Sequence, residues 1–76
     1  MYYVYFLKQE YGKTYIGYTN DLKRRLIEHK DKFPELIYYE AYKSKLDAKD
    51  RERKLKQRGQ AVKRLKGRIR HSLEMI

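Results

Sequence analysis

The tyrosine-rich start of the chain is the feature that most limits its fold, because it holds two short β-forming runs in succession. Residues 2–8, YYVYFLK, are aromatic and β-branched and alternate poorly between apolar and polar positions, which is typical of a strand buried on both faces. Residues 14–18, TYIGY, predict a second strand, and Gly12 lies in the short loop between the two, so the sequence predicts an antiparallel hairpin. Gly17 indicates either a β-bulge or a place where another group approaches the backbone closely.

One helix and a third strand are predicted after the hairpin. The helix is expected to start at Asp21, with Thr19 or Asn20 as its N-cap, and to fade before Pro34. Residues 36–42, LIYYEAY, are again rich in aromatic and β-branched side chains and predict the third strand. The first helix therefore separates the hairpin from the strand that completes the sheet.

Two further helices are predicted in the second half of the chain. Ser44 is expected to cap a helix that runs to about Arg58 and stops at Gly59. Residues 60–73 then repeat apolar side chains at the 3.6-residue period of a helix, and the stripe consists of Val62, Leu65, Ile69 and Leu73. The element order β-β-α-β-α-α predicts an α+β fold in which three helices flank a small three-stranded antiparallel sheet.

Length and composition exclude several classes of protein. The 76 residues suffice for one small domain, so residues 1–76 are expected to fold as one unit. The absence of cysteine excludes a disulfide framework, a thiolate zinc site and a cysteine nucleophile. No apolar run approaches the roughly 20 residues of a membrane span, and the start of the chain lacks the pattern of a secretory signal. We therefore expect a cytoplasmic location.

The positive charge is large and is concentrated in the second half of the chain. The net charge is +10; residues 43–76 hold thirteen Lys or Arg against four Asp or Glu, whereas residues 1–42 hold seven against six. Such an excess predicts a polyanionic partner, and nucleic acid is the first choice. A membrane surface is disfavoured, because the helix predicted at 60–73 has no large aromatic side chain on its apolar stripe.

Four elements stand out as candidates for chemistry, namely the pair Tyr5 and Tyr15, Gly17 after it, Arg25 and Glu52, and His29 is weighed beside them. Tyr5 and Tyr15 lie on neighbouring strands of the predicted hairpin, Arg25 and His29 lie on the first helix, and Glu52 is one of four acids in the basic half. Each has an ordinary structural explanation, since tyrosines pack in strands, arginine is commonly a solvated helix charge and Glu52 can form an i,i+4 ion pair. Their order and spacing are more informative than any one of them.

The order and spacing of these residues resemble the GIY-YIG nuclease superfamily. The first motif reads Tyr3-Val4-Tyr5 in place of GIY, and the other matching segments are YIGYTNDLKRRLIEH from Tyr15 and YYEAY followed by Arg51-Glu52 and Lys56. The chain is most similar to small single-domain bacterial members. It resembles more distantly the nicking domain of the bacterial excision-repair endonuclease, which suggests DNA repair.

The resemblance implies hydrolysis of a phosphodiester bond in DNA with a single divalent cation, Mg²⁺ or Mn²⁺. Tyr5 and Tyr15 match the tyrosines of the two motifs, and Arg25 matches the catalytic arginine of the family. His29 matches the His/Tyr position at the end of the helix, and Glu52 matches the metal-binding glutamate. Tyr15 is the candidate general base, with its proton relayed through Tyr5 or His29.

Basic and tyrosine side chains are expected to hold the substrate backbone. Tyr18 stands where the excision-repair relatives tend to have lysine, and Lys23, Arg24 or a basic residue of the third helix is expected to replace that cation. The expected nucleic-acid contacts are Gly17, Tyr18, Lys23, Arg24, Lys56, Lys63 and Arg64.

Several alternatives stay open at the level of the sequence. The substrate is expected to be double-stranded or branched DNA, with RNA not excluded and no membrane partner. A separate protein partner would supply specificity if the domain works without a DNA-binding module of its own. The oligomeric state and the activity of the isolated domain are not fixed by the sequence. The competing interpretation is a non-catalytic basic module that binds nucleic acid on the same fold.

Overall fold

A computed structural model describes residues 1–9, 12–30, 35–57 and 59–74 of the chain. The helices and strands follow the order β1 (Tyr2–Lys8), β2 (Thr14–Thr19), α1 (Leu22–Glu28), β3 (Glu35–Tyr42), α2 (Lys45–Lys56), α3 (Gln60–Arg68) and α4 (Arg70–Glu74). The predicted α+β class and its three-stranded antiparallel sheet are confirmed. No helix within the described ranges has the length and apolar character needed to cross a membrane.

The strand β1 lies at the centre of the sheet, whose order is β2-β1-β3. Residues 4–7 of β1 are buried, as predicted for a strand covered on both faces. In the hairpin loop, Gly12 has a φ of 75°, the left-handed conformation that favours glycine. The pairing of β1 with β3 shifts between Phe6 and Leu7, which marks an irregularity near one end of the sheet.

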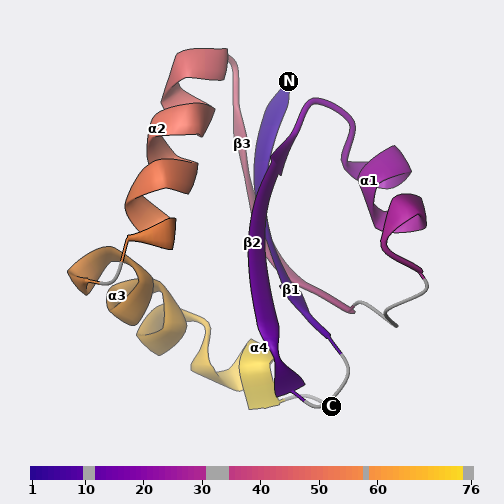
Figure 1. Ribbon diagram of the computed structural model, residues 1–76. Helices are drawn as coiled ribbons and strands as arrows, with labels where there is room; N and C mark the ends of the chain where they lie inside the picture. Colours follow the sequence, from indigo (N-terminus) through magenta and orange to yellow (C-terminus); the bar gives the residue numbers. More distant parts are fainter. Residues whose placement is uncertain (10–11, 31–34, 58, 75–76) are drawn as a thin grey trace.

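The helices cover the two faces of the sheet unequally (Figure 1). The three helices α2, α3 and α4 lie on one face, where Val4 and Phe6 pack against Ala48, Leu55 and Leu65. The apolar stripe predicted for the third helix packs here, as expected. The short helix α1 lies on the other face, and the side chain of Tyr5 points towards it, since its hydroxyl meets the Arg25 side chain.

The ends of α1 differ from the prediction. Asp21 is the N-cap, because its Oδ1 accepts the backbone N–H of Arg24 at 3.1 Å, whereas Thr19 or Asn20 was expected. Thr19 instead accepts the backbone N–H of Asp21 at 3.0 Å and so shapes the turn before the helix. The helix ends at Glu28, with His29 as its C-cap, and Pro34 lies outside the described residues.

The later helices also end differently from the prediction. Ser44 occupies the N-cap of α2 without a capping bond from its side chain, and α2 ends at Lys56 because Gln57 adopts an extended conformation. Arg58 lies outside the described residues. The predicted helix over 60–73 is divided at Ile69 into α3 and α4, so the described chain has four helical segments instead of three. The apolar stripe continues across the break, which is why periodicity alone did not reveal it.

A network of hydrogen bonds and one ion pair links α2 to β3. Nε of Arg51 donates to both carboxylate oxygens of Glu40, at 2.9 and 3.2 Å, and Nη2 donates to Oε2 at 3.1 Å. The hydroxyl of Tyr38 donates to the same carboxylate at 2.7 Å, and Tyr42 also bonds to it. Burial raises the pKa of the Glu40 carboxyl, but the bonds from Arg51, Tyr42 and Tyr38 outweigh it, so the pKa is lowered. Burial and the nearby carboxylate raise the pKa of Tyr42 to about 12.

The Glu40→Gln variant is expected to lose about 2 kcal/mol of unfolding free energy at pH 7, because it leaves the partly buried Arg51 without its counter-charge. Because the pKa of Glu40 is lowered in the folded state, its ionised carboxylate stabilises the fold at pH values above the ordinary carboxyl pKa of about 4.3. This stabilisation is lost as pH falls through the pKa of the folded state. Wild-type stability should therefore fall in acid more steeply than that of the variant.

Wild-type stability should also fall as pH rises from about 10 to about 12, where Tyr42 ionises. Thermal melts across the acid and alkaline ranges test both expectations. The control is Asp50→Asn, which should melt like wild type because the ion pairs of Asp50 are exposed. Equal melts for Glu40→Gln and wild type at pH 7 would contradict it.

Candidate active site

The ring of Tyr5 lies across the backbone of Gly17. The two residues are Cα partners on β1 and β2, and Tyr5 is only 1% exposed. A Cβ built on Gly17 would come closer than 3.0 Å to Oη and Cζ of Tyr5, and would lie 2.9 Å from Cε1 of Tyr15. The close approach predicted at Gly17 is therefore confirmed, and the approaching group is the Tyr5 phenol.

Arg25 holds the Tyr5 hydroxyl from helix α1. Its Nε donates to Oη of Tyr5 at 3.0 Å, and its Nη1 donates to Oε1 of Glu28 at 3.1 Å. Burial raises the pKa of Tyr5, although the bond from Arg25 acts in the opposite direction, so Tyr5 is a neutral phenol at neutral pH. The bonds to Tyr5 and Glu28 raise the pKa of Arg25, which is charged throughout. The guanidinium is thus anchored by its Nε edge, while the Arg25 side chain is 37% exposed.

Three aromatic rings meet beside this bond. The ring centroids of Tyr15 and His29 lie 5.2 Å apart, and that of Tyr5 lies 6.1 Å from Tyr15 and 6.2 Å from His29. Oη of Tyr5 also lies 3.4 Å from Nε2 of His29. The sheet and α1 therefore bring Tyr5, Tyr15, Arg25 and His29 into one cluster, although they are spread over 25 positions of the sequence.

Glu52 lies on α2 and is linked to this cluster only through Lys56 in the described structure. Its Oε2 pairs with Nζ of Lys56 at 3.1 Å, and that Nζ lies 5.9 Å from the centroid of the Tyr15 ring. The predicted i,i+4 ion pair of Glu52 is confirmed, and the Glu52 side chain is 17% exposed. Lys56 thus connects the carboxylate to the tyrosine cluster.

Glu52 is the carboxylate of this site that could serve as a ligand of a divalent cation. The described residues contain no group of three or more His, Cys, Asp or Glu side chains that could form a complete cage. A single carboxylate is sufficient for Mg²⁺, which keeps several waters and commonly takes its remaining ligands from substrate phosphates. Glu52 is therefore suited to hold such an ion together with a nucleic-acid phosphate.

A basic groove of about 480 Å³ continues from Arg25 along the end of β2. Arg24 and Arg25 of α1 line it with Lys45 of α2, and its other lining residues are Tyr18, Thr19, Asn20 and Glu28. Nζ of Lys49 lies 4.2 Å from the centroid of the Tyr18 ring. The groove supplies a path of positive charge that leads to the guanidinium of Arg25.

Sequence reasoning missed Lys45 and Lys49. Both lie on α2, and together with Glu52 and Lys56 they follow the i, i+4, i+7, i+11 spacing of one helix face. That spacing is visible in the sequence, but only the structure shows that this face borders β2. Lys49 places its Nζ over the Tyr18 ring and so brings a positive charge to this residue of β2.

The other predicted nucleic-acid contacts are more scattered. Gly17 is buried beneath the Tyr5 ring and its lack of a side chain admits that ring, while its expected contact with nucleic acid stays a prediction. Lys23 lies on the far side of α1 from Arg25 and lines a different groove. Lys63 and Arg64 are exposed on α3, on the other face of the sheet from α1 (Figure 1).

Comparison with known proteins identifies the family. The family model of the GIY-YIG catalytic domain matches residues 1–67, a range that includes all five candidate residues for catalysis. No curated protein and no solved structure matches the chain. Because the family match covers most of the chain, the protein belongs to the GIY-YIG family, whose domains have a nuclease-type fold and act on nucleic acids.

Proposed function

We propose that the protein is a metal-dependent endonuclease that hydrolyses a phosphodiester bond in DNA. The observation that carries the proposal is the convergence of Tyr5, Tyr15, Arg25 and His29 in one cluster, with Glu52 next to it through Lys56. The guanidinium of Arg25 is held by Tyr5 at Nε and by the exposed Glu28 at Nη1, and its side chain stays 37% exposed, so it is accessible to a substrate phosphate.

Arg25 is proposed to stabilise the transition state. Tyr5 holds the guanidinium at Nε, so a planar and permanently charged group is oriented before substrate arrives. The negative charge that develops on the phosphate oxygens would be met by donors that do not need to reorganise. Tyr5 is then a positioning residue, since burial raises its pKa and keeps its hydroxyl neutral.

Tyr15 is proposed to accept the proton of the attacking water. Its ring is less buried than that of Tyr5 and lies against His29, at 5.2 Å between centroids. His29 and Tyr5 are the two groups beside Tyr15 through which the proton can leave. Lys56 lies near the same ring, with its Nζ 5.9 Å from the ring centroid.

Glu52 is the proposed ligand of Mg²⁺ or Mn²⁺, with water molecules and a substrate phosphate as the other ligands. When bound, the cation would polarise the scissile phosphate and stabilise the leaving oxygen. Without the cation, Lys56 neutralises the carboxylate, as the 3.1 Å ion pair indicates. The positive charge of the basic groove and of α3 supports DNA as the substrate, through contacts with its phosphates.

Nicking of supercoiled plasmid in Mg²⁺ or Mn²⁺ tests the proposal. The wild type should nick, and Glu52→Ala should nick at less than a hundredth of that rate, because the proposed metal ligand is lost. The variant should bind DNA equally or more tightly, since a negative charge is removed. Asp50→Ala is the matched control on the same helix, because Asp50 is paired only with the exposed Arg53 and Lys54 in the described structure.

Two outcomes of that assay would overturn the proposal. Equal nicking by wild type and Glu52→Ala would remove the metal role of Glu52. DNA binding without nicking, for wild type on plasmid and on branched substrates alike, would establish the non-catalytic binding module instead.

A further inference from the structure

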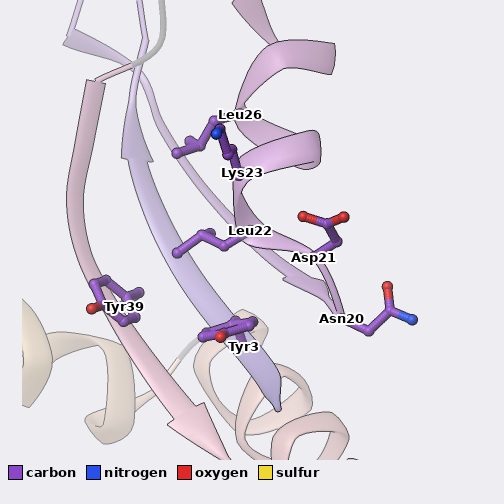
Figure 2. Close-up of a pocket in the computed structure, with 7 residues that line it drawn as sticks. All are labelled: Tyr3, Asn20, Asp21, Leu22, Lys23, Leu26 and Tyr39. Carbon is purple, nitrogen blue, oxygen red and sulfur yellow. The ribbon is translucent and has the colours of Figure 1, made fainter.

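A second groove, on the opposite side of α1 from the basic groove, has a different character. It lies between α1 and the strands β1 and β3, and its volume is about 450 Å³ (Figure 2). The rings of Tyr3 and Tyr39 form one wall and meet edge to face, with their centroids 6.1 Å apart. Leu22 and Leu26 project from α1 towards these rings and form the other wall. We call this the tyrosine groove.

Tyr39 is unusually exposed for an aromatic residue of such a small domain. Its exposed fraction is 51%, although it lies on β3 directly opposite the buried Tyr5. An aromatic and leucine-lined hollow with a few polar groups at its rim is typical of a ligand site. The volume suits a planar heterocycle together with part of its sugar and phosphate.

The rim of the tyrosine groove carries polar groups that could contact the sugar and phosphate of a bound nucleotide. Lys23 lines it, and the chain as a whole has a net charge of +10. Among the described lining residues, the carboxylate belongs to Asp21, whose Oδ1 already accepts the backbone N–H of Arg24 as the cap of α1. A nucleobase fits the aromatic wall, because stacking on tyrosine is available to every nucleobase, and Lys23 offers a positive charge for its phosphate.

The tyrosine groove is connected to the candidate active site. Asn20, at the start of α1, lines both the tyrosine groove and the basic groove that contains Arg25. In the sheet, Tyr5 pairs with Gly17 on one side and with Tyr39 on the other, so the tyrosine groove begins one strand away from the Tyr5 hydroxyl cluster. A DNA strand that places a phosphate at Arg25 and passes Asn20 can put a neighbouring base beside Tyr39.

We propose that the tyrosine groove binds one unpaired nucleobase of the substrate strand, next to the phosphate that is cut. A base inside a duplex is stacked and paired and does not enter such a groove without being unstacked. The protein is therefore selective for DNA with an unpaired nucleotide beside the cleavage position, such as a flap, a gap or a branch. This inference deepens the proposed function and rests on it for the position of the cut.

The test measures binding without cleavage, in buffer that contains EDTA. A fluorescent single-stranded oligonucleotide is compared with a duplex of equal length and with an oligonucleotide of abasic nucleotides, which keeps the phosphates and removes the bases. Tyr39→Ala should weaken binding of the single strand about 10-fold, because a stacking surface is lost, and should change the other two affinities less than 2-fold. Tyr39→Phe should bind like wild type, since it keeps the ring.

Two controls address folding and location. Leu46→Ala removes another exposed apolar side chain, 80% exposed on α2, and should leave all three affinities unchanged. An oligonucleotide that contains 5-iodouracil, which cross-links to a stacked aromatic ring in ultraviolet light, should label Tyr39 or Tyr3. Circular dichroism should show the same melting curve for Tyr39→Ala as for wild type, because the substituted side chain is half exposed.

The results distinguish this inference from the proposed function. Equal weakening of single strand, duplex and abasic strand, no weakening, or labelling outside the tyrosine groove would overturn the base site. Specific loss of single-strand binding together with an inactive wild-type protein would keep the base site and reject the nuclease. A nuclease that cuts plasmid but shows none of the Tyr39 effects would keep the proposed function and reject the base site.

Discussion

The Gly17→Ala variant is expected to lose about 1–3 kcal/mol of unfolding free energy and to lose nicking activity with it. The added Cβ would come closer than 3.0 Å to Oη and Cζ of Tyr5, so the phenol must leave its position. Tyr5 is buried in the central strand and its hydroxyl holds Nε of Arg25, so the displacement reaches the guanidinium. Chemical denaturation and plasmid nicking measure the two effects.

Gly67→Ala is the matched control for that variant. Gly67 lies within α3, and a Cβ built there meets nothing within 4 Å. The substitution should stabilise the protein by about 0.5–1 kcal/mol, because alanine is the better helix former. If Gly17→Ala melted and nicked like wild type, the tight contact between the Tyr5 ring and β2 would not exist in solution.

The Arg25→Lys variant is expected to nick DNA about 10² to 10³ times more slowly than wild type, with little change in melting temperature. A lysine ammonium keeps the charge, but it cannot hold the Tyr5 hydroxyl with one edge and present a planar fork to phosphate with the other. The loss should appear mainly in the rate at saturating DNA, because the charge that attracts the substrate is kept.

Arg24→Lys is the matched control, and it tests whether replacing another arginine of α1 slows nicking to the same extent. Arg24 is exposed, lines the same basic groove and reaches Oδ1 of Asn20 only at 3.5 Å. Its replacement should leave the rate at saturating DNA within about 2-fold of wild type, as for a phosphate-positioning charge. Equal rates for Arg25→Lys and wild type would remove Arg25 from the transition state.

Much of the sheet could be predicted because local preferences and tertiary structure agree there. The aromatic and β-branched runs became β1, β2 and β3 with small changes of boundary, and Gly12 has the positive φ expected of a turn glycine. The helix ends were less predictable. Three consecutive residues before α1 can all act as N-caps, and the choice of Asp21 depends on the turn that Thr19 makes with it.

The candidate site was predictable to the extent that motif spacing determines it. The resemblance to the GIY-YIG superfamily predicted Tyr5, Tyr15, Arg25, His29 and Glu52 as a set, and the structure places the first four in one cluster. It did not predict the bond from Arg51 to Glu40 or the position of Lys45, because these depend on how α2 lies against the sheet. The tyrosine groove was hidden for the same reason, since Tyr3 and Leu22 meet only across the fold.

The shortness of α1 has a consequence for how this protein responds to its substrate. The helix has seven residues and none of them is buried, so apolar packing anchors it weakly, and Arg25 and the C-cap His29 add polar contacts to Tyr5. A segment of this kind is among the first to open by local unfolding. A ligand that binds only the closed form of α1 protects it from opening, so the affinity for that ligand and the local stability of the helix are thermodynamically linked.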